Sequence, residues 1–403
     1  MPLETVGAVI LIGPGGETPQ EQLVYRAVQA TVLDLLDILN AQGVSPVVVA
    51  GQDLAWLPDT LNVILDADEE PFHFGQRLAG VIERYRLSPV MYFGAGSTPL
   101  LNQDMVGLMH GMLYRSEYAS NSQIPTHIAL TNNLHSSDWV GVTHTGDALP
   151  IIRRAERDNS LAWMLQENWE FDVRVLSGVR PASSMDLDTP SDLAIARLHP
   201  LCPPHLAEAL RDPLLDRVPV ERVIKAIAQD GNRVALIGRV SPLAWQALNK
   251  ATLTWIRVFS EERGMVASER LARGEVRSLM LRLIELVGPK GFFDELAQIV
   301  DVAIIDTRVL MAASARYPGD ADRFASDLLL VEEIGDSWVR EFTDAAAQAP
   351  IPVLLGGHGV VAGGLYALAD VIAERRKAGQ PPKPSERVLP TGRCFLRPYG
   401  SAR

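Results

Sequence analysis

Short apolar runs alternate with amphipathic helical patterns along this chain, and this alternation restricts its fold more than any other feature of the sequence. In the first half, runs of strand length lie at residues 8–12, 45–50, 63–65, 89–93, 127–130, 139–143 and 173–176. Between the earlier runs, apolar residues recur at spacings of three and four, as over residues 21–41. Strands that alternate with crossover helices predict a largely parallel sheet and an α/β fold class.

A second alternation of the same kind begins at Arg233 and predicts a second α/β unit. Its apolar runs lie at residues 233–238, 254–259, 300–306 and 351–357. Helical patterns separate these runs, and one of them predicts a long helix over residues 267–287. The second sheet is therefore also expected to be mostly parallel.

Two domains are expected because 403 residues exceed what one hydrophobic core usually serves. We place the first domain at residues 1–200, a proline-rich connection at 201–219, the second domain at 220–376 and a tail at 377–403. Hydrophobic residues make up 47% and charged residues 21% of the chain, which is typical of a folded globular protein.

The chain is acidic, with 49 Asp and Glu against 37 Lys and Arg, and no dense basic stripe offsets this charge. Nucleic acid is therefore not an expected partner. A small phosphorylated ligand is compatible with this charge, because backbone amides and one divalent cation can hold it locally. No run approaches the roughly 18 apolar residues of a membrane span, so no membrane partner is expected and the predicted location is cytoplasmic.

The strongest motif is MDLDTPSDLAIARL, at residues 185–198. It places Asp186 and Asp188 at a predicted strand end, with Thr189 as the N-cap of a helix and Asp192 in its first turn. Carboxylates at such a position suit Mg2+, which needs only one or two of them when phosphates and water complete its shell. The alternative is that D-T-P-S-D is simply a good helix start.

Two further segments accompany this motif in the first half. The strand AVILI runs directly into a loop formed by Gly13, Pro14, Gly15 and Gly16, where a nucleotide would approach bare backbone amides. The segment YFGAGSTPLL follows another predicted strand and offers the hydroxyl groups of Ser97 and Thr98.

Together these segments resemble MobA-like and related GT-A nucleotidyltransferases, although only in the N-terminal half. The ending D-x-D-T-P-x-D-L is found in that family, and GAGSTPLL is similar to its G-S-D-x-P-L-L segment. The resemblance implies a Rossmann-like GT-A domain that binds a nucleoside triphosphate and a small anionic acceptor. It also implies Mg2+ as cofactor, with Asp188 as its ligand and Asp186 beside it.

The sequence departs from the family pattern in both loops. Ser97 and Thr98 stand where the family keeps its first metal-binding aspartate. The first loop is acidic, GPGGETPQEQ, where the family usually places a basic residue. These departures leave a second hypothesis open, in which the domain has lost catalysis and serves as a ligand-binding or assembly module.

Other polar groups in the first half are candidates for ligand contact. The guanidinium groups of Arg153, Arg154 and Arg157 are the best local candidates for phosphate binding. A polar group between two predicted strands contains Asn132, Asn133, His135 and Asp138. The alternative interpretation of that group is an ordinary hairpin turn.

The second half resembles no family that we recognise, so only the general rule for open α/β sheets applies. Ligands bind beyond the carboxyl ends of the strands, where the sequence places Arg239, Glu261, Arg308 and His358. Two arginines beside the glycine-flanked His358 suit an anionic small molecule. The alternative is that these are ordinary polar strand ends. A third hypothesis therefore puts the chemistry in this half, and assembly into homo-oligomers stays open.

Overall fold

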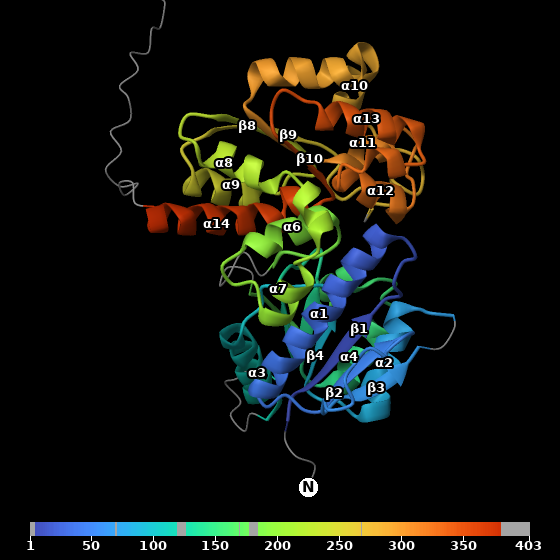
Figure 1. Ribbon diagram of the computed structural model, residues 1–403. Helices are drawn as coiled ribbons and strands as arrows, with labels where there is room; N and C mark the ends of the chain where they lie inside the picture. Colours follow the sequence, from blue (N-terminus) through green and yellow to red (C-terminus); the bar gives the residue numbers. More distant parts are fainter. Residues whose placement is uncertain are drawn as a thin grey trace, which may run out of the picture.

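The computed structural model describes residues 5–68, 71–118, 126–168, 170–176, 184–266 and 268–379. Its strands form two sheets, each with its own helices, and we call these units the first body and the second body. Figure 1 shows the second body above the first. The predicted α/β class with two sheets is thus confirmed. No helix of the described residues is both long and apolar enough to cross a membrane.

The first sheet has seven strands in the order β3-β2-β1-β4-β6-β5-β7. They are β1 (Gly7–Ile12), β2 (Val47–Gly51), β3 (Ile64–Ala67), β4 (Val90–Gly94), β5 (Ile128–Thr131), β6 (Trp139–Val142) and β7 (Asp172–Val175). All neighbouring pairs are parallel except those of β6, which runs antiparallel to β4 and β5. Each predicted strand is present, and the polar group between β5 and β6 occupies a hairpin connection.

The helices of the first body follow the predicted patterns. They are α1 (Pro19–Ala41), α2 (Phe74–Tyr85), α3 (Gln103–Glu117), α4 (Thr145–Ile152), η1 (Asp158–Ser160) and α5 (Leu161–Gln166). Helix α1 begins at a capping box, in which the Thr18 and Glu21 side chains each accept a backbone N–H of the other residue. Leu23, Val24 and Ala27 of α1 belong to the hydrophobic cluster of the second body, so α1 joins the two bodies.

The second sheet has four parallel strands in the order β11-β10-β8-β9. They are β8 (Arg233–Gly238), β9 (Trp255–Ser260), β10 (Val302–Asp306) and β11 (Val353–Gly356). All four were predicted. The chain passes from β8 outward to β9 and then returns to the other side of β8, so the direction of the strand order reverses between β8 and β10.

The helices of the second body cover both faces of this sheet, as Figure 1 shows, except α7, which lies beside α1. They are α7 (Pro204–Ala209), η3 (Pro213–Arg217), α8 (Val220–Ala228), α9 (Pro242–Ala251), α10 (Leu279–Ile299), α11 (Thr307–Ala313), α12 (Asp320–Asp327), η4 (Val331–Glu333), α13 (Ser337–Ala347), η5 (Gly359–Val361) and α14 (Gly363–Gly379). Of the predicted tail, only the first residues lie within the described part, at the end of α14.

The predicted helix over residues 267–287 is wrong at its start. Helix α10 begins only at Leu279, with Ser278 as its N-cap, and a loop precedes it. Within that loop Gly274 has a φ of 65°, a left-handed conformation that a helix cannot contain. The apolar spacing typical of a helix continues through this loop in the sequence. Gly274 and the N-cap Ser278 nevertheless prevent a helix from starting before Leu279. Gly288, with a φ of 75°, bends α10 further along.

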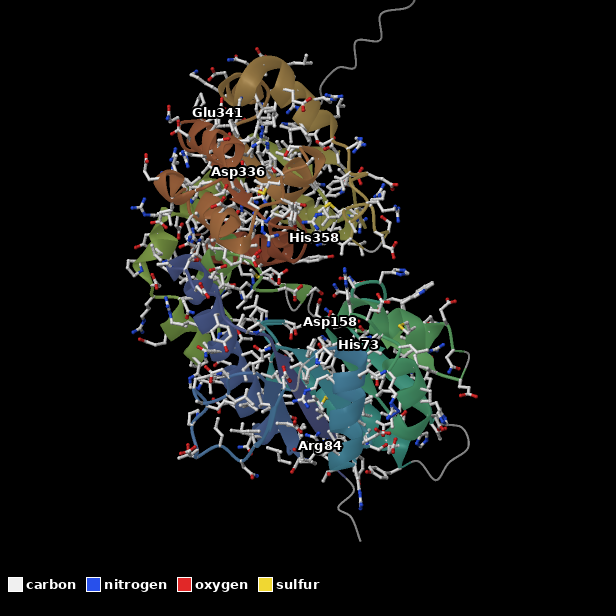
Figure 2. All side chains as sticks on the ribbon, turned by 90° about the vertical axis from the view of Figure 1, so that its right-hand side faces the viewer. His73, Arg84, Asp158, Asp336, Glu341 and His358 are labelled. Atoms are coloured by element: carbon white, nitrogen blue, oxygen red, sulfur yellow. The ribbon has the colours of Figure 1, made fainter. Side chains whose placement is uncertain are left out.

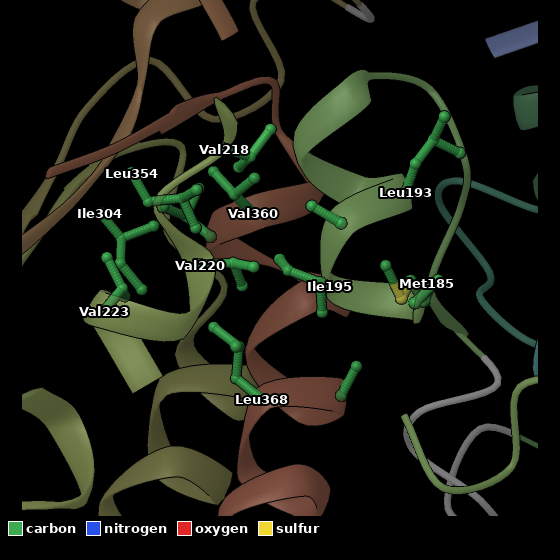
Figure 3. Packing of buried hydrophobic residues seen from close by; sticks show 14 of the residues in the cluster. Met185, Leu193, Ile195, Val218, Val220, Val223, Ile304, Leu354, Val360 and Leu368 are labelled. Carbon is green, nitrogen blue, oxygen red and sulfur yellow. The ribbon is translucent and has the colours of Figure 1, made fainter. Parts of the chain in front are cut away.

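Helix α6 (Pro190–Leu198), which carries the end of the strongest motif, packs against the second body. Leu193 and Ile195 lie in one hydrophobic cluster with Leu354 of β11 and Leu368 of α14, as Figure 3 shows. The Ser191 hydroxyl donates a hydrogen bond to the carbonyl oxygen of Leu355 at 2.5 Å. The motif therefore leaves the first sheet and docks on the second, and the domain boundary at residue 200 stays a prediction.

The loop GGHGVVAGG, which follows β11, packs closely against the start of helix α6. A methyl group at Gly359 would collide with the Asp192 carboxylate, and one at Gly357 would lie 3.0 Å from Cγ2 of Thr189. These glycines thus allow helix α6 to approach the loop closely. Backbone packing explains them without a bound molecule.

Candidate active site between the two sheets

The reversal point of the first sheet lies between β1 and β4, where an open α/β sheet usually binds its ligand. The loop of Gly13, Pro14, Gly15 and Gly16 connects β1 to α1 there, and most of it is exposed to solvent. It lies beside the segment after β4, because the Ala95 amide donates to the carbonyl oxygen of Leu11 at 2.8 Å. The two loops singled out in the sequence are therefore neighbours.

The chain's own carboxylate satisfies the amides at the start of α1. One oxygen of Glu21 accepts the N–H groups of Glu17 at 3.1 Å and Thr18 at 2.9 Å. The same oxygen accepts the Thr18 hydroxyl at 2.8 Å. Hydrogen bonds from Thr18 are the largest cause that lowers the pKa of Glu21. A phosphate approaching this edge therefore meets the glycine loop rather than the helix start.

The segment with Asp186 and Asp188 lies directly against the loop after β4. Asp186 forms an isolated antiparallel bridge with Ser97, and the Leu187 amide donates to the carbonyl oxygen of Gly96 at 3.1 Å. The expectation that these aspartates end a strand is wrong for the described residues, since only this single bridge holds them. The Ser97 hydroxyl donates to the carbonyl oxygen of Gly94 at 2.6 Å, so it serves its own loop.

The predicted helix start after Asp188 is confirmed. Thr189 is the N-cap of α6 and Pro190 its first residue. The Thr189 hydroxyl donates to Oδ2 of Asp192 at 2.7 Å, and Asp192 is fully buried. Burial raises the pKa of Asp192 well above its usual range. Asp192 therefore belongs to the helix start and to its contact with the second body.

Four carboxyl groups converge at this edge: those of Asp138, Asp158, Asp186 and Asp188. Asp138 precedes β6, accepts the side-chain amide of Asn132, and shares a hydrogen bond with Asp186. Burial, helped by the charges of Asp188 and Asp158, raises the pKa of Asp138 to about 7, although its hydrogen bonds act in the opposite direction. We call these four residues the acid cluster.

The remaining members of the acid cluster are perturbed in the same direction. Burial is the largest cause that raises the pKa of Asp186, and the charges of Asp138 and Asp188 add to it. Burial also raises the pKa of Asp158, whose carboxylate accepts the Tyr92 hydroxyl at 3.5 Å. Such mutually repelling carboxylates stabilise a bound cation.

The donor set fits Mg2+ when a substrate phosphate shares the ion. Oδ1 of Asp186 is buried and has no hydrogen-bond partner within the described residues. No group of three His, Cys, Asp or Glu side chains in that part of the chain is arranged to hold a metal ion by itself. Mg2+ commonly takes one or two carboxylates and completes its shell with phosphate and water. Asp186 and Asp188 are the residues that would hold it.

The second sheet presents arginines at its own carboxyl edge, each paired with a buried aspartate. Arg239 after β8 binds Asp306 of β10, with Nε 2.6 Å from Oδ2 and Nη2 3.0 Å from Oδ1. Arg308 binds Asp327 through both terminal nitrogens, at 2.7 Å and 2.6 Å. Its side chain is only 5% exposed. Arg308 is thus held in the interior.

Glu261 is turned away from these arginines. Its carboxylate accepts the Ser278 hydroxyl at 2.6 Å and the Leu279 amide at 2.8 Å, at the start of α10. Glu261 therefore does not pair with Arg239 or Arg308. It has a structural task at a helix start, where a carboxylate is favourable.

The two carboxyl edges face each other through Asp188. Burial raises the pKa of Asp188, the charges of Arg239 and Arg308 lower it, and the charge of Asp158 raises it. Solvent still reaches the side chain, so protein surrounds Asp188 on several sides without sealing it from water. Figure 2 shows Asp158 on the first body and His358 on the second, on opposite sides of the same region.

The three arginines proposed for phosphate contact have different surroundings. Arg153 forms an ion pair with Glu83 of α2. Arg154 is exposed at the end of α4. Arg157 is exposed and precedes Asp158, whose pKa its charge lowers. The structure therefore brings Arg157 to the acid cluster.

Asp138 and Asp158 join the site although the sequence did not identify them as metal or catalytic residues. Asp138 was noted only as part of a polar group, because its position depends on the antiparallel pairing of β6 with β4. A pattern of strand-length runs does not reveal strand direction. Asp158 follows Arg157 at the start of η1, and only the folded chain brings it near Asp138.

Comparison with known proteins gives only weak likenesses. No protein family and no curated protein matches the chain. A cytidylyltransferase from Leptospira borgpetersenii serovar Hardjo-bovis (strain JB197) has a TM-score of 0.35 and 13% identity, over 52% of this chain and 96% of that chain. A protein from Aquifex aeolicus VF5 has a TM-score of 0.32 and 16% identity, over 46% and 94%. With scores this low, neither likeness carries an argument.

Proposed function

We propose that this protein transfers a nucleotidyl group from a nucleoside triphosphate to a small phosphorylated or otherwise anionic acceptor, with Mg2+ as cofactor. The observation that carries the proposal is the acid cluster. Four carboxyl groups lie at the reversal point of an α/β sheet, and one oxygen of Asp186 lacks a hydrogen-bond partner in the described part of the chain. Phosphoryl chemistry needs mainly positioning and charge compensation, which such an edge supplies.

At the carboxyl edge of the first sheet, each residue has a distinct role in this proposal. Asp186 and Asp188 hold Mg2+, and Asp138 supports Asp186 through their shared hydrogen bond. When bound, Mg2+ neutralises charge on the triphosphate and on the leaving pyrophosphate. The glycine loop after β1 meets the nucleotide, and Arg157 contacts its phosphates.

The reaction balances as a substitution at phosphorus. An oxygen of the acceptor forms a bond to the α-phosphorus, and the bond from that phosphorus to the bridging oxygen of the β-phosphate breaks. Pyrophosphate leaves with the bonding electron pair. Asp188 stands between the first edge and the arginines of the second, so acceptor and nucleotide approach from opposite bodies.

The direct test is titration of the full chain with ATP, GTP, CTP and UTP in the presence of Mg2+, followed by calorimetry. We expect one nucleotide to bind and its affinity to fall when EDTA removes the metal. No heat and no thermal shift with any of the four would contradict the proposal. For variants of the acid cluster, Asp172→Asn is the matched control, because Asp172 is an exposed acid of the same sheet.

A second candidate function is a ligand-binding or assembly module without catalysis. Two observations favour it specifically: Glu21 already occupies the amides at the start of α1, and Ser97 offers no carboxylate. The two candidates separate in one assay. Mg2+-dependent release of pyrophosphate from any nucleoside triphosphate removes the second, whereas binding without turnover across a panel of anionic acceptors removes the first.

A further inference from the structure

We propose that Arg239, Arg263 and His358, at the carboxyl edge of the second sheet, form a subsite that binds a phosphate or carboxylate group of the acceptor. We call it the acceptor subsite. Its role as an acceptor site rests on the proposed function, whereas its binding of an anion does not.

The topology of the second sheet puts these residues at the ligand-binding position of an open α/β sheet. The strand order reverses between β8 and β10, and the crevice beyond the strand ends opens at such a point. Arg239 follows β8, and its partner Asp306 ends β10. The ion pair of Arg239 with Asp306 therefore lies at the reversal point itself.

The acceptor subsite carries an excess of positive charge. Asp306 engages Nε and Nη2 of Arg239, which leaves Nη1 without a hydrogen-bond partner among the described residues. Arg263 is exposed, and its guanidinium has no ion-pair partner in the same part of the chain. The charge of Asp306 acts on His358 against the charges of Arg239 and Arg263. The free Nη1 of Arg239 and the unpaired guanidinium of Arg263 favour an anion at this edge.

His358 is positioned to contact a ligand that binds beside Arg239 and Arg263. It follows β11 at the carboxyl edge of the sheet, and its side chain is accessible to solvent. Burial among protein groups, with the charges of Arg239 and Arg263, lowers the pKa of His358 to about 4. The imidazole is therefore neutral near pH 7 and adds a hydrogen-bonding group without adding charge.

The acids on the neighbouring loop do not cancel this charge. Glu261 accepts hydrogen bonds at the start of α10. Glu262 accepts the Arg277 amide at 3.2 Å and forms an ion pair with Arg270 at 2.9 Å. Both glutamates are thus engaged elsewhere, and Arg263 stays available.

The acceptor subsite faces the acid cluster. The charge of Arg239 acts on both Asp188 and His358, so Arg239 lies near both sets of residues. An acceptor anchored there by one anionic group would direct its reacting oxygen toward the nucleotide on the first body. The substrate class is therefore a small molecule with at least one phosphate or carboxylate group.

Isothermal titration of the full chain with inorganic phosphate, and separately with acetate, tests the acceptor subsite and distinguishes the two anions. The key variant is Arg263→Gln, because an exposed arginine can be replaced without loss of the fold. We expect its affinity for the better probe to fall about tenfold, as for loss of one charge-assisted hydrogen bond. The matched control Arg273→Gln changes an exposed arginine of the same loop that pairs with Glu275, and its affinity should stay within about twofold of wild type.

The outcomes separate this proposal from the proposed function. If wild type binds neither probe, or if Arg263→Gln binds as wild type does, the acceptor subsite is refuted. If Arg263→Gln weakens the anion but no nucleoside triphosphate binds or turns over, the anion site stands and the nucleotidyl transfer fails. If transfer occurs with an acceptor KM that Arg263→Gln leaves unchanged, the function stands without this subsite.

Discussion

The two sheets end in opposite chemistry at equivalent places. At the reversal point of the first sheet, four carboxyl groups crowd together and no arginine is bound to them by an ion pair within the described residues. At the reversal point of the second, Arg239 is paired with buried Asp306, and Arg308 is paired with Asp327 nearby. The first edge therefore consists of carboxyl groups without a paired cation, whereas the second contains preformed ion pairs. Under our proposal, the metal binds at the first body and the acceptor anion at the second.

The strongest test of this difference is to remove one of the buried ion pairs of the second sheet. Replacing Arg308 with Gln leaves Asp327 buried and uncompensated, so we expect the free energy of unfolding to fall by about 3 to 5 kcal/mol. Urea denaturation of the full chain measures it. Arg282→Gln, which breaks the exposed pair with Glu285, should cost about 0.5 kcal/mol or less. Equal losses in the two variants would show that the second edge is not preorganised.

A second experiment tests the acid cluster of the first body. Asp188→Ala should lower Mg2+-dependent nucleotide affinity about 100-fold while the fold stays intact, because a solvent-accessible carboxylate is not needed by the core. Calorimetry with and without Mg2+ gives the affinity, and circular dichroism checks the fold. Unchanged affinity would reduce the D-x-D-T-P-x-D-L segment to a helix start.

A third experiment tests whether the motif helix must dock on the second body. Gly359→Ala places a methyl group against the Asp192 carboxylate, so we expect destabilisation of about 1 to 3 kcal/mol. Gly13→Ala is the control, because nothing lies within 4 Å of its added carbon. A thermal melt compares them. If Gly359→Ala is as stable as wild type, the close approach of α6 to the β11 loop is not required.

A fourth experiment concerns the pH dependence of stability. Because the folded pKa of Asp138 is raised to about 7, the folded state binds this proton more tightly than the unfolded state does. The contribution of Asp138 to stability is therefore fully present at low pH and is lost as pH rises from about 4 through 7. Asp138→Asn should flatten this part of the pH dependence, measured as unfolding free energies at a series of pH values. Parallel curves for the two proteins would mean that Asp138 titrates as an ordinary aspartate.

The sequence predicts the architecture well and the site only in part. Strand-length runs located the strands of both sheets, because buried parallel strands are continuous and apolar. The helix start at Thr189 followed from cap chemistry alone. The antiparallel direction of β6, which brings Asp138 to the acid cluster, has no local signature. The pairing of Arg308 with Asp327 and the docking of α6 depend on contacts between residues far apart in the chain, and spacing does not encode them.

The central claim is that the two edges form one site, and a paramagnetic metal tests it most directly. Mn2+ replaces Mg2+ at carboxylate sites and broadens NMR signals of nearby protons only. We predict that Mn2+, titrated into the full chain, selectively broadens the ring-proton signal of His358, assigned with His358→Gln, and that Asp188→Asn abolishes this effect. Saturable Mn2+ binding that leaves His358 sharp would contradict the account, because the metal site and the acceptor subsite would then be separate.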